Sequence, residues 1–207
     1  MIGPSRITAA IALCTLPVFA QAQMRCGELV TLSTHEQSTT HYTLVKPAAS
    51  GTNAKSITLV LLVGGGGNLN LDEQGYPTEL KGNSLVRSAP IFQKLGFATA
   101  LVDAPSHYMT GDGLAGFRAA PLHAEDLGKV ISDVRARTHA PVWVVGTSRG
   151  TISAANVASR AQGDAAPDGV VLSSALSVGS VARKSWVAQT LFDVPLENIR
   201  MPVLVIG

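Results

Sequence analysis

The feature that most constrains this chain is a strand-like run that ends in a Gly-x-Ser-x-Gly pentapeptide. Residues 141–146 read Pro-Val-Trp-Val-Val-Gly, and the pentapeptide occupies residues 146–150 with Ser148 at its centre. A buried strand, a sharp turn and a helix in that order expose the serine hydroxyl at the end of a sheet. Glycine is favoured two residues before and two residues after the serine, because the backbone comes close to itself there. Ser148 is therefore the candidate nucleophile. The alternative is a structural turn whose serine only caps the helix.

The residues that follow predict a helix with one narrow face. Gly150, Ala154 and Ala158 recur every four residues, which places them on the same side of a helix. A face built of such small residues lets the helix lie close against a sheet.

Other β-leaning runs occur at regular intervals along the chain. The runs at residues 27–34 and 41–46 are joined by a polar link and predict an antiparallel hairpin. Further apolar runs predict buried strands at residues 57–63, 97–102, 142–146, 169–174 and 202–206.

Three segments between these runs carry helical patterns. Residues 121–137 give the clearest one, with apolar positions at i, i+3, i+4 and i+7 and charges that suit the helix dipole. A short helix is predicted with Ser88 as its cap and Pro90 in its first turn. The apolar stripe of this short helix is Ile91, Phe92 and Leu95. A third helix is predicted over residues 180–191. Strands that alternate with helices predict an α/β fold with a mostly parallel, doubly wound sheet behind an N-terminal antiparallel hairpin.

The first 22 residues are typical of a secretory signal peptide. Arg6 supplies a positive charge, residues 7–20 are almost wholly apolar, and Ala20-Gln21-Ala22 fits the small-x-small cleavage pattern. The apolar run is too short to span a membrane. We expect cleavage after Ala22, which leaves residues 23–207 as one domain in a secreted or periplasmic protein.

Composition argues against several kinds of partner. The chain is 46% hydrophobic and 14% charged, as expected of one well-buried core. Its net charge is +2 with no basic run, so nucleic-acid binding is not predicted. The 5 histidines are scattered, and Cys26 has no neighbouring thiol, so neither a metal site nor a cofactor is predicted. His123 and His139 are expected on a solvated helix face.

Residues 64–67 are four consecutive glycines at the end of a predicted strand. A nucleotide-binding loop is not favoured, because the dinucleotide spacing of glycines and a following Gly-Lys-Ser/Thr are both missing. Acyl transfer instead requires two backbone N–H groups aimed at the developing oxyanion. We expect one donor from Gly65 or Gly66 and the other from the backbone of Arg149. The alternative is a loop that is merely flexible.

Taken in order, residues 57–67, 97–103 and 142–150 resemble the α/β-hydrolase superfamily, and the likeness extends over essentially all of the mature chain. The glycine run resembles the oxyanion loop of lipases and esterases, with Val63 in place of the histidine of the fuller His-Gly-Gly-Gly form. Secreted bacterial hydrolases are the most similar group. The resemblance implies a serine hydrolase that acts on a small acyl substrate through Ser148, with an acid after a later strand and a histidine after the last one.

The positions of the histidines conflict with that order, because all 5 precede Ser148. The run at residues 202–206 lies where the superfamily continues toward its acid and histidine. We therefore expect a chain truncated at its C-terminus, without the last strand and helix of the fold and without the triad Asp and His. The rival is a substitute dyad of His107 with Asp103 beside it. Otherwise these two residues are expected to line the pocket.

Three functions remain open at this stage. The first is cleavage of an ester or related acyl bond, and the second is a peptidase or amidase activity of the prolyl oligopeptidase-like kind. The third is a degenerate or incomplete hydrolase fold that serves as a binding domain. Fold alone does not decide among them.

Overall fold

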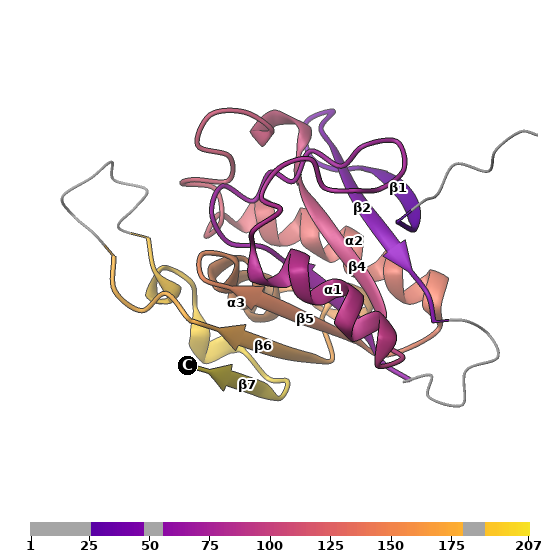
Figure 1. Ribbon diagram of the computed structural model, residues 1–207. Coiled ribbons are helices and arrows are strands. Elements are labelled where there is room, and N and C mark those ends of the chain that lie inside the picture. The colour runs from indigo at the N-terminus through magenta and orange to yellow at the C-terminus, as the bar shows by residue number, and fades with distance from the viewer. Residues whose placement is uncertain (1–25, 48–55, 180–188) are drawn as a thin grey trace, which may run out of the picture.

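A seven-stranded sheet runs through the protein in the order β1-β2-β4-β3-β5-β6-β7 (Figure 1). The computed structural model describes residues 26–47, 56–179 and 189–207. The strands are β1 (Glu28–Ser33), β2 (Thr39–Val45), β3 (Thr58–Leu62), β4 (Ala98–Pro105), β5 (Val142–Thr147), β6 (Gly169–Ser173) and β7 (Val203–Ile206). The expected signal peptide at residues 1–22 lies outside the described residues, as does nearly all of the helix predicted over residues 180–191.

The direction of the strands confirms the predicted fold class. β1 and β2 form an antiparallel hairpin, and β2 pairs antiparallel with β4. β4, β3, β5, β6 and β7 are all parallel. Val60 of β3 lies between Ala100 of β4 and Val144 of β5 in register. Because both faces of this central part are covered, β3 is buried along its whole length.

Helices cover both faces of the sheet. The described residues contain α1 (Ser84–Lys94), α2 (Pro121–Thr138) and α3 (Gly150–Arg160). α1 lies on one face, and α2 and α3 lie together on the other (Figure 1). The larger core cluster joins α2 and α3 to β3, β4, β5 and β6, and a smaller one joins α1 to the opposite face of the same strands. The predicted apolar stripe of α2, namely Leu127, Val130, Ile131 and Val134, is buried in the larger cluster.

The predicted start of α1 is wrong. Asn83, not Ser88, caps the helix, because its side chain accepts a hydrogen bond from a backbone N–H of the first turn. Pro90 lies inside the helix rather than in its first turn. Two residues of the predicted stripe turn outward, with Ile91 57% and Leu95 53% exposed, whereas Phe92 packs against the smaller core cluster. The fully buried side chains are those of Leu85 and Ala89.

α3 packs so closely on the sheet that its first residue has to be glycine. A Cβ on Gly150 would lie 2.1 Å from the carbonyl oxygen of Leu62 at the end of β3. A Cβ on Gly146 would lie 2.5 Å from the carbonyl oxygen of Gly150. Every residue of α3 except Arg160 is buried. The narrow face predicted for this helix is thus confirmed.

β7 forms the outer edge of the sheet within the described part of the chain. Its side chains are 44–63% exposed. Along the stretches that the structure describes, no helix is long and apolar enough to cross a membrane.

We predict that Gly150→Ala lowers the free energy of unfolding by about 2–4 kcal/mol, because the added methyl group meets main-chain atoms that cannot move aside cheaply. Chemical denaturation measures this loss. Gly82→Ala is the matched control, because a Cβ there meets nothing within 4 Å and should change stability by less than about 0.5 kcal/mol. Equal effects for the two variants would contradict the packing described for α3.

Candidate active site

Ser148 stands on the turn between β5 and α3 in a conformation that non-glycine residues rarely adopt. Its φ is +50°, in the left-handed region, and its side chain is exposed at the carboxyl edge of the sheet. The turn is held on both sides: the Ser148 N–H donates to the Ser173 carbonyl at 3.0 Å, and the Ser148 carbonyl accepts from Thr151 N and Oγ1. Strain of this kind persists only when the surroundings enforce it, and it is frequent at functional sites.

The first of the four glycines, Gly64, lies directly beside Ser148. A Cβ on Gly64 would lie 3.0 Å from Ser148 Cβ and 3.5 Å from Ser148 Oγ. Gly64 to Gly67 form a tight turn closed by a 3.2 Å hydrogen bond from Gly67 N to the Gly64 carbonyl. Gly65 and Gly67 have φ values of +59° and +84°, which only glycine adopts without cost.

The amides of Gly65 and Gly66 in this turn have no acceptor in the part of the chain that the structure describes. Arg149 occupies the N-cap position of α3, so its backbone lies at the positive end of the helix. The structure thus brings together Ser148 and the three residues predicted as oxyanion donors, Gly65, Gly66 and Arg149.

A buried arginine lies under the glycine turn. Arg118 is 3% exposed, and its Nη2 donates to the carbonyls of Val63 and Gly65 at 3.1 and 3.2 Å. Its Nη1 donates to Ser153 Oγ on α3 at 2.8 Å. Burial lowers the pKa of Arg118 to about 9, with a smaller contribution from Arg149, so the guanidinium is still a cation at neutral pH. The sequence interpretation did not single out Arg118.

His123 shares Ser153 with this arginine, and its predicted place on a solvated face is wrong. The imidazole is 2% exposed, and its Nε2 lies 2.9 Å from Ser153 Oγ. α3 covers this part of α2, which the helical periodicity of α2 alone does not reveal. Burial lowers the pKa of His123 to about 3, and the nearby Arg118 cation lowers it further.

The carboxylate of Asp103 is hydrogen-bonded to backbone N–H groups. It accepts hydrogen bonds from Leu69 N at 2.6 Å, Leu71 N at 3.0 Å and Ala104 N at 2.8 Å. Burial raises the pKa of Asp103, while these backbone donors favour its ionised form. The residue also lines a small internal cavity with Arg118. Its described contacts fix the loop after the glycine turn.

His107 is exposed on a short 3₁₀ turn after β4, within an aromatic cluster. Its ring meets that of His35 edge-on at 5.7 Å, and Tyr108 stacks on Phe117 at 4.2 Å. The Nδ1 atom of His35 in turn hydrogen-bonds to Oδ2 of Asp126 at 2.5 Å. Since neighbouring strands lie about 4.8 Å apart, the ends of β4 and β5 are about 10 Å apart with β3 between them.

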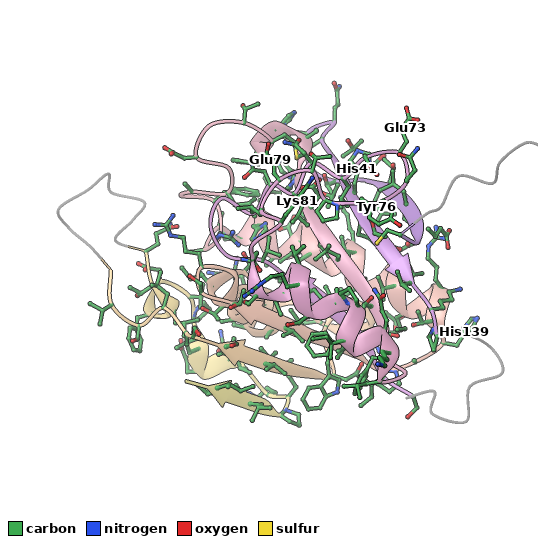
Figure 2. All side chains as sticks on the ribbon, viewed as in Figure 1. His41, Glu73, Tyr76, Glu79, Lys81 and His139 are labelled. Carbon is green, nitrogen blue, oxygen red and sulfur yellow. The ribbon has the colours of Figure 1, made fainter. Side chains whose placement is uncertain are left out.

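None of the 5 histidines hydrogen-bonds to Ser148 Oγ. His41 contacts Thr31 at 2.9 Å on the outer hairpin. His139 ends α2 and lies well apart from Glu73 and Lys81 of the polar loop (Figure 2). Within the described ranges, no group of three or more histidine, cysteine or acidic side chains could hold a metal ion.

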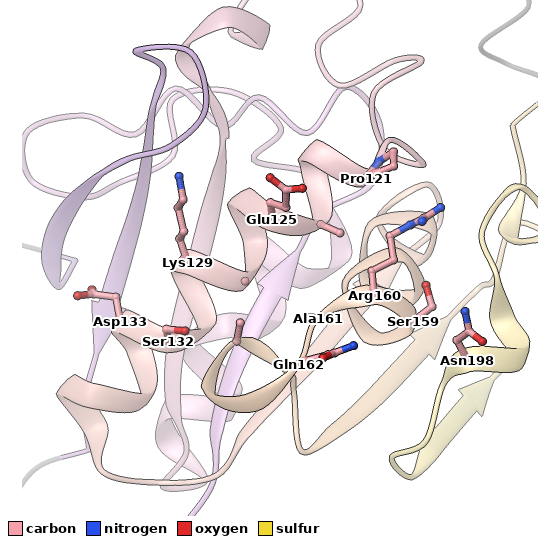
Figure 3. Close-up of a pocket in the computed structure, with 13 residues that line it drawn as sticks. Pro121, Glu125, Lys129, Ser132, Asp133, Ser159, Arg160, Ala161, Gln162 and Asn198 are labelled. Carbon is pink, nitrogen blue, oxygen red and sulfur yellow. The ribbon is translucent and has the colours of Figure 1, made fainter.

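A large groove lies elsewhere on the molecule. It has a volume of about 1020 Å³ and runs along α2 past the end of α3, between Glu125, Lys129, Arg160 and Asn198 (Figure 3). Ser148 and the glycine turn do not contribute to its lining. Cavity size therefore does not mark the site at Ser148, which lies open at the sheet edge.

Comparison with solved structures identifies proteins that share this architecture. An α/β serine hydrolase without a lid from Xanthomonas campestris has a TM-score of 0.53 at 16% identity, over 86% of this chain and 69% of its own. A cold-adapted esterase from an Arctic intertidal metagenomic library has a TM-score of 0.52 at 18% identity, over 86% and 69%. A thermophilic esterase from the planctomycete Thermogutta terrifontis has a TM-score of 0.55 at 16% identity, over 88% and 72%.

These likenesses and the strand order define the class: the chain has the α/β-hydrolase fold. No model of a known protein family matches the sequence, and no curated protein matches it either.

We predict that the buried, neutral His123 makes stability fall in mild acid. Its pKa is lower in the folded protein than in the unfolded chain, so below about pH 6.5 only the unfolded chain takes up the proton. Above that pH, His123 should therefore cause no change in the free energy of unfolding with pH. Between pH 7 and pH 5 this residue should lower the free energy of unfolding by about 2 kcal/mol. In His123→Gln, which can still hydrogen-bond to Ser153, that part of the decrease disappears. Parallel pH curves for parent and variant in urea denaturation would contradict the prediction.

Proposed function

We propose that the protein is a serine hydrolase that cleaves a carboxylic ester or a related acyl bond through an acyl-enzyme on Ser148. The observation that carries this proposal is the exposed Ser148 in a left-handed turn, in contact with Gly64, the first residue of a glycine turn whose Gly65 and Gly66 amides have no acceptor among the described residues. Ester rather than amide substrates are favoured because two of the solved structures described above are esterases.

In the proposed reaction Ser148 Oγ attacks the carbonyl carbon of the substrate, and its proton passes to a base. The negative charge that develops on the carbonyl oxygen is stabilised by backbone N–H groups of Gly65 or Gly66 and of Arg149. Collapse of this tetrahedral species breaks the bond to the leaving group, which takes up the proton. Water then attacks the acyl-enzyme by the same route and frees Ser148.

The base is the part of this proposal that the described residues do not supply. A serine hydroxyl is too weak an acid to react at neutral pH without one, and no histidine within residues 1–207 hydrogen-bonds to Ser148. We propose that the base and its acid partner lie beyond residue 207. His107 is the rival, although its exposed ring contacts His35 instead.

The nucleophile is tested by labelling with a fluorophosphonate and locating the adduct by mass spectrometry. In the chain extended through the downstream reading frame we expect the adduct on Ser148 and none in Ser148→Ala. Ser174→Ala is the matched control, because Ser174 is also exposed at a strand end with a φ of +50°, and this variant should label like the parent. An adduct elsewhere, or equal labelling of Ser148→Ala, would exclude Ser148.

The position of the base is tested by comparing turnover of a p-nitrophenyl short-chain ester by two chains. Loss of a triad histidine lowers kcat on the order of 10⁶-fold, so a chain that ends at residue 207 should be almost inactive. A chain extended through the downstream reading frame should be active, and His107→Gln should leave that activity unchanged. Activity of the shorter chain that His107→Gln abolishes would establish the substitute dyad. An extended chain that neither labels nor turns over ester would favour the binding-domain alternative.

A further inference from the structure

Arg118 is a buried cation for which the proposed reaction has so far no role. Its guanidinium lies between the glycine turn and α3, and no ion pair joins it to a carboxylate in the described parts of the chain. Its Nε has no hydrogen-bond partner there. A buried charge without a counter-ion is costly, so the contacts that it does make have to offset that cost.

Those contacts are made with the main chain of the glycine turn. Nη2 binds the carbonyl oxygens of Val63 and Gly65 together. In a trans peptide the C=O and the following N–H point in opposite directions. With both carbonyls directed at Arg118, the N–H groups of Gly64 and Gly66 are directed away from it. Gly66 N–H has no acceptor within the described residues.

We propose that Arg118 is a positioning residue for the oxyanion hole: it holds the carbonyls of Val63 and Gly65 inward and thereby keeps the Gly66 N–H available beside Ser148. This inference rests on the proposed function for its catalytic consequence. The cation also draws electron density toward the two carbonyl oxygens, which makes the N–H groups of the same peptide units better donors to an oxyanion.

The surroundings of Arg118 are shaped to admit this side chain. A Cβ on Gly67 would lie 2.8 Å from Nη2, so only glycine leaves room for the guanidinium. Asn156 on α3 donates to the Arg118 carbonyl at 2.9 Å and fixes its backbone. Ser153, five residues after Ser148, accepts from Nη1. Arg118 therefore ties the glycine turn to the helix that begins at the nucleophile.

A second support limits how far the turn can move without Arg118. Leu114 N donates to the Gly66 carbonyl at 2.7 Å, and Gly113 packs against Gly66. The turn should therefore persist in Arg118 variants but lose its fixed peptide orientation. Lysine should replace arginine only in part, because a single ammonium group lacks the planar fork that reaches two carbonyls and Ser153 together.

The first test is independent of catalysis and uses amide hydrogen exchange in the chain of residues 1–207. In Arg118→Gln we expect exchange at Gly67 N–H, which closes the turn, to rise at least about tenfold, with a smaller rise in Arg118→Lys. Arg200→Gln is the matched control, since this exposed arginine binds the Glu197 carbonyl and makes no other hydrogen bond to the described residues. Unchanged exchange at Gly67 in both Arg118 variants would overturn the proposal. Should Arg118→Gln not fold, Arg118→Lys decides by the same measurement.

The second test separates kcat from KM for an ester substrate. Loss of one oxyanion donor lowers rate on the order of 10²–10³-fold, so a mispositioned one in Arg118→Lys should lower kcat by about 10–100-fold with KM within about twofold of the parent. A merely structural role would lower the folded fraction and leave the kcat of the folded protein unchanged, which would overturn the positioning role. The kinetic test uses the chain extended through the downstream reading frame; an inactive extended parent with altered Gly67 exchange in the variants would reject the proposed function while leaving Arg118 as the residue that holds the turn.

Discussion

The contact between α3 and the ends of β3 and β5 is the constraint on which the rest of the site depends. Because Gly150 lies against the Leu62 carbonyl, the chain has to reverse direction within the residues just before α3. The reversal places Ser148 in the left-handed region, at a cost of about 1–3 kcal/mol. The same contact brings Gly64, two residues beyond Leu62, against the serine side chain. Nucleophile and glycine turn are thus set by one packing interaction.

Beneath this contact the core is polar where an apolar one would be expected. Arg118 and His123 both meet Ser153 Oγ, and Asn156 binds the main chain on either side of Ala119 through the Arg118 and Ala120 carbonyls. Arg118 precedes α2 and His123 lies on α2, whereas Ser153 and Asn156 lie on α3. Partly satisfied polar groups in a low-dielectric interior are sensitive to any displacement, so this network specifies one position of α3 relative to the glycine turn.

The sequence predicted the strands, α2 and the serine turn well because each has a strong local pattern. Continuous apolar runs mark β3 to β7, and Gly146 and Gly150 mark the turn by a spacing with a direct steric cause. The predicted start of α1 is wrong because proline is typical of a first helical turn but also lies within a helix when packing offsets the cost of the missing hydrogen bond, as Pro90 does here. The class of the fold followed from the order of these elements.

The supporting residues were missed because their roles depend on long-range contacts. His123 has the same local sequence pattern whether α3 covers it or not, and Arg118 lies in an irregular segment with no periodicity. One signal was present: Ser153 and Asn156 are polar residues in the middle of α3, a helix rich in small residues. Polar side chains on a helix buried along its length require partners, and those partners proved to be Arg118 and His123.

The way Arg118 holds the glycine turn has an evolutionary consequence. The hydrogen bonds from Arg118 to the turn end on main-chain carbonyls. They therefore do not depend on which side chain is present at position 63, where this protein has valine. Substitution at that position is therefore limited by the packing of Val63 in the smaller core cluster and not by the hydrogen bonds of the turn. The selective constraint on the turn is carried by a residue 55 positions away along the chain, and coevolution should link the arginine to Gly67 and Ser153 more tightly than to its own neighbours in sequence.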